Sequence, residues 1–169
     1  MKPIATSPPR LENEARTLDL EHYLPFRLSV LSNRVTRAVA QVYARRFQLS
    51  APEWRTMAVL GRYGAMTANS VVERTAMDKV RVSRAVARLL VHERITRRTD
   101  PGDRRRAILD LTAEGRAIYA QVVPMVLAVE NELLSDLSSE ERAMLDEIVG
   151  KLERRTAQAF GGGEPEEEA

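Results

Sequence analysis

The feature that most constrains the fold is the stretch from residue 67 to residue 111. Thr67 and Asp78 are good N-caps, and they predict two short helices, 67–74 and 79–93, with TAMD as the turn between them. The segments ITRRT and RAILDL that follow alternate apolar and polar residues, and the Pro-Gly pair between them favours a turn. The stretch therefore predicts a helix-turn-helix followed at once by a small two-stranded hairpin with a basic tip, which is the layout of a winged helix-turn-helix.

The second of these helices carries two unlike faces. Its apolar residues fall within roughly 60° of arc about the helix axis: Val82, Val86 and Leu89. Its arginines gather on a different side: Arg81, Arg84 and Arg88. Such a helix is expected to pack on its domain through one face and to enter a groove of DNA with the other.

Charge is distributed unevenly along the chain, although the net charge of the 169 residues is only +2. Residues 1–61 carry +4, residues 62–106 carry +7 and residues 107–169 carry −9. A basic middle and an acidic C-terminal third favour one surface that meets a polyanion and another that is kept away from it. From charge alone, the alternative is that the basic helices are ordinary solvated surface.

Apolar residues at helical spacing precede the central stretch. From about Asp19 to Phe47 their period predicts a helix that begins or bends near Pro25. The apolar stripe of this helix is Leu24, Leu28, Leu31, Val35, Val39 and Val42.

A second helix is expected before the central stretch. Ser50 and Glu53 have capping-box spacing and open a helix to about Arg62, which Gly61 and the glycine three residues later end. Trp54 has the spacing of a core residue in this helix, and a ligand platform is the less favoured interpretation.

Two further helices are expected after the hairpin. Thr112 caps a long helix that Pro124 should kink, and Ser138 with Glu141 forms a capping box for the last helix. The apolar residues of these two helices are Ile118, Val122, Val126, Val129 and Leu133, and then Met144, Leu145, Ile148, Val149 and Leu152.

Composition and missing motifs narrow the class of protein. The sequence has no cysteine, which excludes disulfides, thiolate metal sites and thiol-based peroxide sensing. It has neither an apolar run of about 18 residues nor an N-terminus like a signal peptide, so we expect a cytoplasmic protein with no membrane partner. No nucleophile–base pair, glycine-rich phosphate loop or metal cluster indicates an enzyme, and we expect no cofactor and no bound metal.

The chain from about Leu20 to Phe160 resembles the MarR family of bacterial transcription regulators. Three segments carry the resemblance: LSAPEWRTMAVLGRYG, TAMDKVRVSRAVARLL and DPGDRRRAILDLTAEGRAIY. The third segment is the most specific, because Asp-x-Arg in the wing followed by L-x-L-T-x-x-G is a family hallmark. Here the two motifs stand at residues 103–105 and 109–115. The resemblance implies a mainly α fold of about six helices with a small β-hairpin wing.

The resemblance also implies a triangular homodimer in which the N-terminal and C-terminal helices of both subunits interlock. The apolar stripes of the first, fifth and sixth helices make no sensible core within one winged domain, and against a second copy they would form an obligate interface. We therefore expect a flexible N-terminal arm (1–18), a helical dimerisation region (19–47 and 112–160), a winged helix-turn-helix DNA-binding domain (48–111) and a disordered acidic tail (161–169).

Several residues are assigned to double-stranded DNA through the recognition helix. Arg81, Ser83 and Arg84 are assigned to base edges in the major groove, where arginine reads guanine, and Lys79 lies near the same end of the helix. Arg88 lies further along and is at best a phosphate contact.

The wing and the first short helix supply the other assignments. Arg105 matches the family's wing arginine, which enters the minor groove, and Asp103 matches the residue that orients it; a structural hairpin staple is the alternative. Two neighbouring arginines are assigned to phosphates or solvent: Arg104 and Arg106. The start of the first short helix holds either a phosphate or only a cap: Thr67, Asn69 and Ser70.

The segment HYLPFRLSVLSNR resembles the MarR subgroup that responds to aromatic acids, in which an arginine at this place meets the ligand carboxylate. This position is Arg27, which offers a fork for a carboxylate beside the aromatic surface of Tyr23 and Phe26. His22 and Ser32 are expected as neighbours in the pocket. The alternative is an interface arginine paired with an acidic residue of the C-terminal helices.

The sequence thus predicts a sequence-specific DNA-binding transcriptional regulator, as a repressor that acts as a homodimer. Its recognition helices would lie about one DNA turn apart on a pseudo-palindromic operator, and a small aromatic or phenolic carboxylate would release it. The alternatives are a regulator without a small-molecule effector and a winged-helix scaffold that binds protein. The basic face of the recognition helix disfavours the scaffold.

Overall fold

The computed structural model describes residues 18–100, 102–103 and 105–160. The predicted arm up to residue 17, the predicted tail at 161–169 and Arg104 lie outside the described residues. Residues up to Arg37 and residues from Ala38 onward form two compact units, and α1 (Leu24–Phe47) begins in the first and ends in the second.

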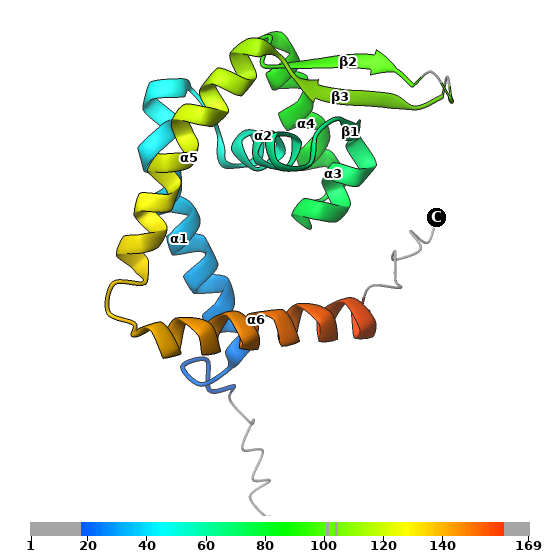
Figure 1. The fold of residues 1–169 in the computed structure, drawn as a ribbon. Helices are drawn as coiled ribbons and strands as arrows, with labels where there is room; N and C mark the ends of the chain where they lie inside the picture. The colour runs from blue at the N-terminus through cyan, green and yellow to red at the C-terminus, as the bar shows by residue number, and fades with distance from the viewer. Residues whose placement is uncertain (1–17, 101, 104, 161–169) are drawn as a thin grey trace, which may run out of the picture. The chain divides into compact units, whose positions relative to one another are not determined.

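After α1, the chain forms α2 (Ala51–Tyr63), β1 (Met66–Thr67), α3 (Ala68–Thr75) and α4 (Lys79–Val91). The hairpin β2 (Ile95–Thr99) and β3 (Ala107–Leu111) follows, and then the long helices α5 (Ala113–Leu133) and α6 (Ser139–Phe160) (Figure 1). The described chain is therefore mainly helical with a small β wing, as the sequence predicts. No helix among the described residues is both long and apolar enough to span a membrane.

Local capping sets most of these boundaries. The Thr67 hydroxyl accepts a hydrogen bond from the Ser70 amide, and the Asp78 carboxylate accepts one from the Arg81 amide. The Thr112 hydroxyl caps α5 through the Gly115 amide. These three predicted N-caps are confirmed, because the short polar side chain satisfies an amide that the first helical turn leaves without a partner.

The sheet has three strands in the order β1-β3-β2, where the sequence predicts only two. β3 is central: it pairs antiparallel with β2 from Ile95↔Leu111 to Thr99↔Ala107, and with β1 through Met66↔Leu109 and Thr67↔Ile108. A strand of two residues is too short to show an alternating pattern, so the sequence does not predict β1. The strand predicted from Arg106 begins one residue later, because Arg106 closes the turn through hydrogen bonds with Asp100 and Asp103.

The core extends beyond the winged helix-turn-helix. Trp54 is buried as predicted, and its ring lies 5.6 Å from that of Tyr43 and 5.9 Å from that of Tyr119, between centroids. The end of α1 and the first half of α5 add further buried residues to this core: Tyr43, Phe47, Ile118 and Val122. The expectation that the first and fifth helices contribute no core to the winged domain is therefore wrong for these segments.

Gly61 lies inside α2 and does not end it, contrary to the sequence prediction. A Cβ atom at this position would lie 2.6 Å from Cε2 of Tyr119, so the glycine leaves room for a ring of α5 against the helix. The helix ends two residues later, and Gly64 then takes a positive φ of 81°.

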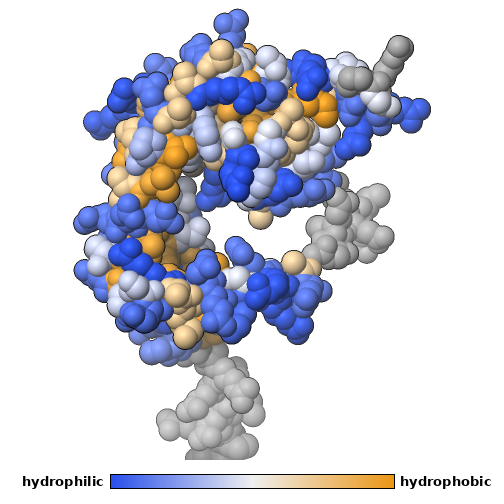
Figure 2. All heavy atoms as spheres, in the orientation of Figure 1, coloured by the Kyte–Doolittle hydropathy of each residue, from blue (hydrophilic) through white to orange (hydrophobic). Residues whose placement is uncertain are grey.

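Other apolar stripes stay on the surface of the single chain. On α6 the exposed large apolar residues are Met144, Leu145, Ile148, Val149 and Leu152. On α1 they are Leu24, Phe26, Leu28 and Leu31, and on α5 they are Leu127 and Leu133. Figure 2 shows hydrophobic residues at the surface along α5, between hydrophilic ones.

Candidate nucleic-acid interface

The predicted recognition helix is α4, and its two faces are as expected. Val82, Ala85, Val86 and Leu89 are buried, whereas the polar residues assigned to DNA are exposed: Lys79, Arg81, Ser83, Arg84 and Arg88. The Arg81 Nε lies 3.1 Å from an Asp78 carboxylate oxygen, and both side chains are more than half exposed. Exposed pairs contribute at most about 1 kcal/mol, so Arg81 can exchange this partner for a nucleic acid at little cost.

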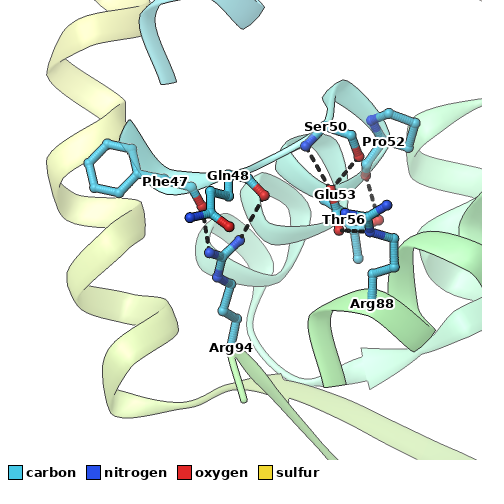
Figure 3. Close-up of polar contacts among 8 residues, drawn as sticks. All are labelled: Phe47, Gln48, Ser50, Pro52, Glu53, Thr56, Arg88 and Arg94. Carbon is cyan, nitrogen blue, oxygen red and sulfur yellow. Dashed lines mark hydrogen bonds and ion pairs between the residues drawn. The ribbon is translucent and has the colours of Figure 1, made fainter. Parts of the chain in front are cut away.

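Arg88 has a partner that the sequence analysis missed. Its Nε donates to Oε1 of Glu53 over 3.0 Å, and the Glu53 side chain is completely buried (Figure 3). The other oxygen of Glu53 accepts hydrogen bonds from the backbone amide and the hydroxyl of Ser50. Capping-box spacing points to the Ser50–Glu53 contact, but nothing in the local sequence points to an arginine 35 residues away.

The wing turn is closed by backbone contacts of two aspartates. Oδ1 of Asp103 accepts a hydrogen bond from the backbone amide of Arg105 over 3.0 Å, and its carbonyl accepts one from the Arg106 amide over 2.9 Å. Oδ1 of Asp100 accepts one from the Gly102 amide over 2.8 Å. Asp103 therefore fixes the backbone of Arg105. Arg105 itself is exposed.

A hollow of about 390 Å³ lies between the start of α3 and the wing. Its lining brings together Thr67 at the end of β1, Asn69, Ser70 and Glu73 of α3, and Arg105 and Arg106 of the wing. Arg97 of β2 also lines this hollow, although the sequence analysis did not select it. Arg97 lies on the same face of β2 as the buried Ile95, and a regular alternating pattern would place an apolar residue there. In the structure only Ile95, the first residue of β2, is buried, so Arg97 is exposed.

A second hollow of about 340 Å³ lies between α3, α4 and the sheet. Asn69, Lys79, Ser83 and Arg97 supply its polar lining, and side chains such as Val82 and Leu109 supply an apolar floor. Since Asn69 and Arg97 line both hollows, the exposed surface is continuous from α4 to the wing. Arg81, Arg84 and Arg88 line neither hollow, so they form a separate group on α4.

The candidate effector residues lie on the first unit. A shallow hollow of about 230 Å³ is lined by Phe26 and Arg27 together with Leu20, Glu21, Val30, Leu31 and Arg34. Tyr23, His22 and Ser32 do not line it, and Nδ1 of His22 lies 2.8 Å from an Asp19 carboxylate oxygen instead. Arg34 was missed, although its spacing of two helical turns from Arg27 places both on one face.

The sequence and the fold both match known transcription regulators. A model described as the MarR family matches residues 47–106. The chain is 31% identical over 146 residues to the HTH-type transcriptional regulator PecS of Dickeya dadantii, and the match covers 84% of this chain and 87% of PecS. It is 27% identical over 115 residues to the HTH-type transcriptional repressor NicR of Pseudomonas putida, covering 68% of this chain and 73% of NicR.

A solved structure shares the fold at low identity. BpsR of Bordetella bronchiseptica, from a structure on the regulation of its DNA binding by 6-hydroxynicotinic acid, superposes with a TM-score of 0.64 at 24% identity. The superposition covers 75% of this chain and 98% of BpsR.

Proposed function

Since the chain belongs to the MarR family of DNA-binding transcriptional regulators, which are not enzymes, we propose that it is a repressor that acts as a homodimer and is released by a small aromatic carboxylate. The observation that carries this proposal is the continuous surface from α4 to the wing, on which exposed arginines surround the start of α3. NicR, a relative, is named a repressor, which supports the same role here.

Beside this surface, the exposed arginines of α4 read sequence in the major groove. Arg84 and Arg81 are suited to guanine, whose two major-groove acceptors match a guanidinium, and Ser83 contacts a neighbouring base edge. Lys79 near the start of the helix adds positive charge toward the phosphates. Arg88 contacts a phosphate through the nitrogens that Glu53 leaves free, and the buried carboxylate fixes the direction of its side chain.

The wing and α3 hold the DNA backbone and the minor groove. Arg105 enters the minor groove, whose negative potential attracts a guanidinium, and Asp103 supports it by fixing the backbone of the turn. A phosphate lies in the hollow at the start of α3, where Thr67, Asn69 and Ser70 supply polar groups and Arg97 supplies charge. Arg106 adds charge in the same hollow, and Arg104 stays a predicted contact with phosphate or solvent.

A second copy of the chain covers the exposed apolar residues of α1, α5 and α6. These stripes include residues such as Leu31 and Ile148 that are about half exposed in the single chain, where they gain no stabilisation from burial. Burial against a second copy would create an obligate interface of about 2,000 Å² or more. The dimer then presents two copies of α4 to half-sites about one DNA turn apart.

The effector site lies around Arg27. Its guanidinium pairs with the carboxylate of an aromatic acid, the ring of Phe26 packs on the ligand, and Arg34 adds positive charge in the same hollow. The regulation of BpsR by 6-hydroxynicotinic acid supports this ligand class, since that compound is an aromatic carboxylic acid. The second copy of the chain would have to bring the other predicted pocket residues toward the ligand: Tyr23, His22 and Ser32.

Binding of the purified chain to DNA tests the proposal. Duplexes are selected from a random library, and the affinity of the selected duplex is measured against salt and against 6-hydroxynicotinic acid, with uncharged benzyl alcohol as control. We expect a palindromic selected sequence, an affinity that falls steeply with salt, and release by the acid alone. Specific binding that neither compound changes would favour a regulator without an effector, and no selection above non-specific binding would favour a protein-binding scaffold.

A further inference from the structure

The face of α4 opposite its buried residues contains apolar side chains as well as arginine. The buried residues Val82, Ala85, Val86 and Leu89 define the inner face of the helix. At 100° per residue, the residues directly opposite this face lie within about 60° of arc: Val80, Arg84, Ala87 and Val91. Val80 is 57% exposed and Val91 is 79% exposed.

Val80 is an exposed apolar residue at a position that usually contacts DNA. It is the second residue of α4, at the end of the helix that meets base edges in helix-turn-helix proteins. A β-branched residue is a weak helix former, and an exposed one gains nothing from burial. Single exposed apolar residues are common on protein surfaces. Val80 differs from them by its place between Lys79, Arg81 and Arg84.

Lys79, Arg81 and Arg84 flank Val80, so the partner of this part of α4 is a polyanion. Under the proposed function, this polyanion is DNA. The major groove carries hydrogen-bonding groups on every base pair but only one methyl group, at C5 of thymine. A valine that is brought against base edges by flanking cations can therefore gain apolar contact from thymine alone.

We propose that Val80 determines sequence specificity by contacting the C5-methyl group of a thymine next to the guanine read by Arg84. The two residues are one helical turn apart, which corresponds to about 6 Å along the helix axis. Successive base pairs lie about 3.4 Å apart, so the thymine lies within about two base pairs of the guanine. This inference rests on the proposed function of α4 and adds a base and a residue to it.

Val91 provides a matched control on the same helix. It has the same side chain, lies on the same line of α4 and is more exposed than Val80. It is three helical turns away, about 16 Å along the axis, at the end of the helix that does not meet base edges. Both Val80→Ala and Val91→Ala raise helix propensity, so both variants are expected to fold.

The experiment selects duplexes from a random library with the wild-type chain, Val80→Ala and Val91→Ala in parallel. We expect the wild type and Val91→Ala to select the same half-site, with a thymine at a fixed place beside a guanine. Val80→Ala should retain the guanine and lose the preference for thymine.

The selected thymine is then replaced by deoxyuridine, which removes only the methyl group. The wild-type affinity should fall about threefold to fivefold, the value of one methyl group leaving water, whereas Val80→Ala should change less than about 1.5-fold. An unchanged wild-type affinity at every selected thymine, or an equal fall in Val80→Ala, would overturn the assignment of Val80. If the wild type selects no sequence at all, the proposed function fails and the role of Val80 with it.

Discussion

Ion pairs of similar length contribute unequally to the stability of this fold, and the pair of Glu53 with Arg88 is the stronger case. Its carboxylate is fully buried and accepts hydrogen bonds from Ser50 and from Arg88, which belongs to the recognition helix. Asp78 and Arg81 form a pair of similar length at the start of the same helix, but both are largely exposed. Burial and not distance separates the two pairs, because a buried carboxylate that loses its partner has no water to replace it.

A double-mutant cycle on these two pairs should show the difference. We expect Glu53→Gln and Arg88→Gln each to lower the free energy of unfolding by about 1–3 kcal/mol, with a coupling energy of about 1 kcal/mol between them. The matched cycle with Asp78→Asn and Arg81→Gln should give a coupling energy near zero, and the asparagine can still cap the helix. Chemical denaturation measures all seven proteins, since both cycles share the wild type, and equal coupling in both cycles would contradict the expected effect of burial.

Arg105 should be the wing residue on which DNA binding depends most. We expect Arg105→Ala to weaken binding to the selected duplex at least tenfold at fixed salt, because the variant loses the minor-groove contact proposed for Arg105. Arg116→Ala is the control, since Arg116 pairs with Asp110 over 2.7 Å and lines neither hollow. Titrations by fluorescence anisotropy measure both, and an unchanged affinity of Arg105→Ala would remove the wing assignment.

Tyr43 gives the core a dependence on alkaline pH. Its side chain is 1% exposed, and burial raises the pKa of Tyr43 from 10.0 to about 12, although nearby Arg55 lowers it. The folded state keeps a proton that the unfolded chain releases, so this stability is complete below about pH 10 and is lost as the pH rises to about 12. We expect the melting temperature to fall more steeply in this range for the wild type than for Tyr43→Phe, and parallel curves would contradict the shift.

Elements of the second unit are joined through contacts between distant segments. The guanidinium of Arg94, just after α4, is buried and donates hydrogen bonds to the carbonyls of Phe47 and Gln48 at the end of α1 (Figure 3). The carbonyl of Arg94 accepts a hydrogen bond from Thr112, where α5 begins. One residue thus connects the end of α1, the recognition helix, the wing and α5.

The packing of α5 on α2 can be tested with two glycines in helix interiors. Gly61→Ala should lower the free energy of unfolding by about 1–3 kcal/mol, because the new Cβ would meet the Tyr119 ring at 2.6 Å. Gly150→Ala in α6 should raise it by about 0.5–1 kcal/mol, because its nearest neighbour is the movable end of Arg154 at 3.3 Å. Thermal unfolding of both variants measures the effects, and equal changes would show that helix propensity alone decides them.

The function of the whole molecule requires coupling between the effector residues and the DNA-binding surface. Arg27 lines a hollow in the first unit, and the arginines of α4 belong to the second. Under the proposed function, a ligand would therefore act on DNA binding by favouring one arrangement of the proposed dimer over another. α1 contains Arg27 near its start and ends at the residues that Arg94 holds. The same helix therefore contains the proposed ligand residue and the residue whose carbonyl is bonded to Arg94.

Arg27→Ala should therefore separate the two activities. We expect its affinity for the selected duplex to stay within about twofold of the wild type, while 6-hydroxynicotinic acid no longer releases it. Arg37→Ala is the control on α1, because Arg37 is exposed and does not line the hollow. Binding is measured with and without the acid, and a normal response of Arg27→Ala would make Arg27 a structural residue.

The sequence alone determined the helices, their N-caps, the two faces of α4 and the place of the wing. These features depend on groups a few residues apart, such as Thr67 with Ser70 or Asp78 with Arg81, and they can be recognised by spacing. Arg27 was selected only through family resemblance, since its spacing does not distinguish it from the other arginines of α1.

Only the tertiary structure decided which distant segments meet. Strand β1 forms because β3 offers a free edge, Gly61 stays inside a helix because the Tyr119 ring packs on it, and Arg97 joins the wing arginines because only the first residue of β2 is buried. The same holds for Arg88, whose partner lies 35 residues away. Such contacts follow from how the elements share one core, and this sharing is a property of the whole packed domain and not of any short stretch of the chain.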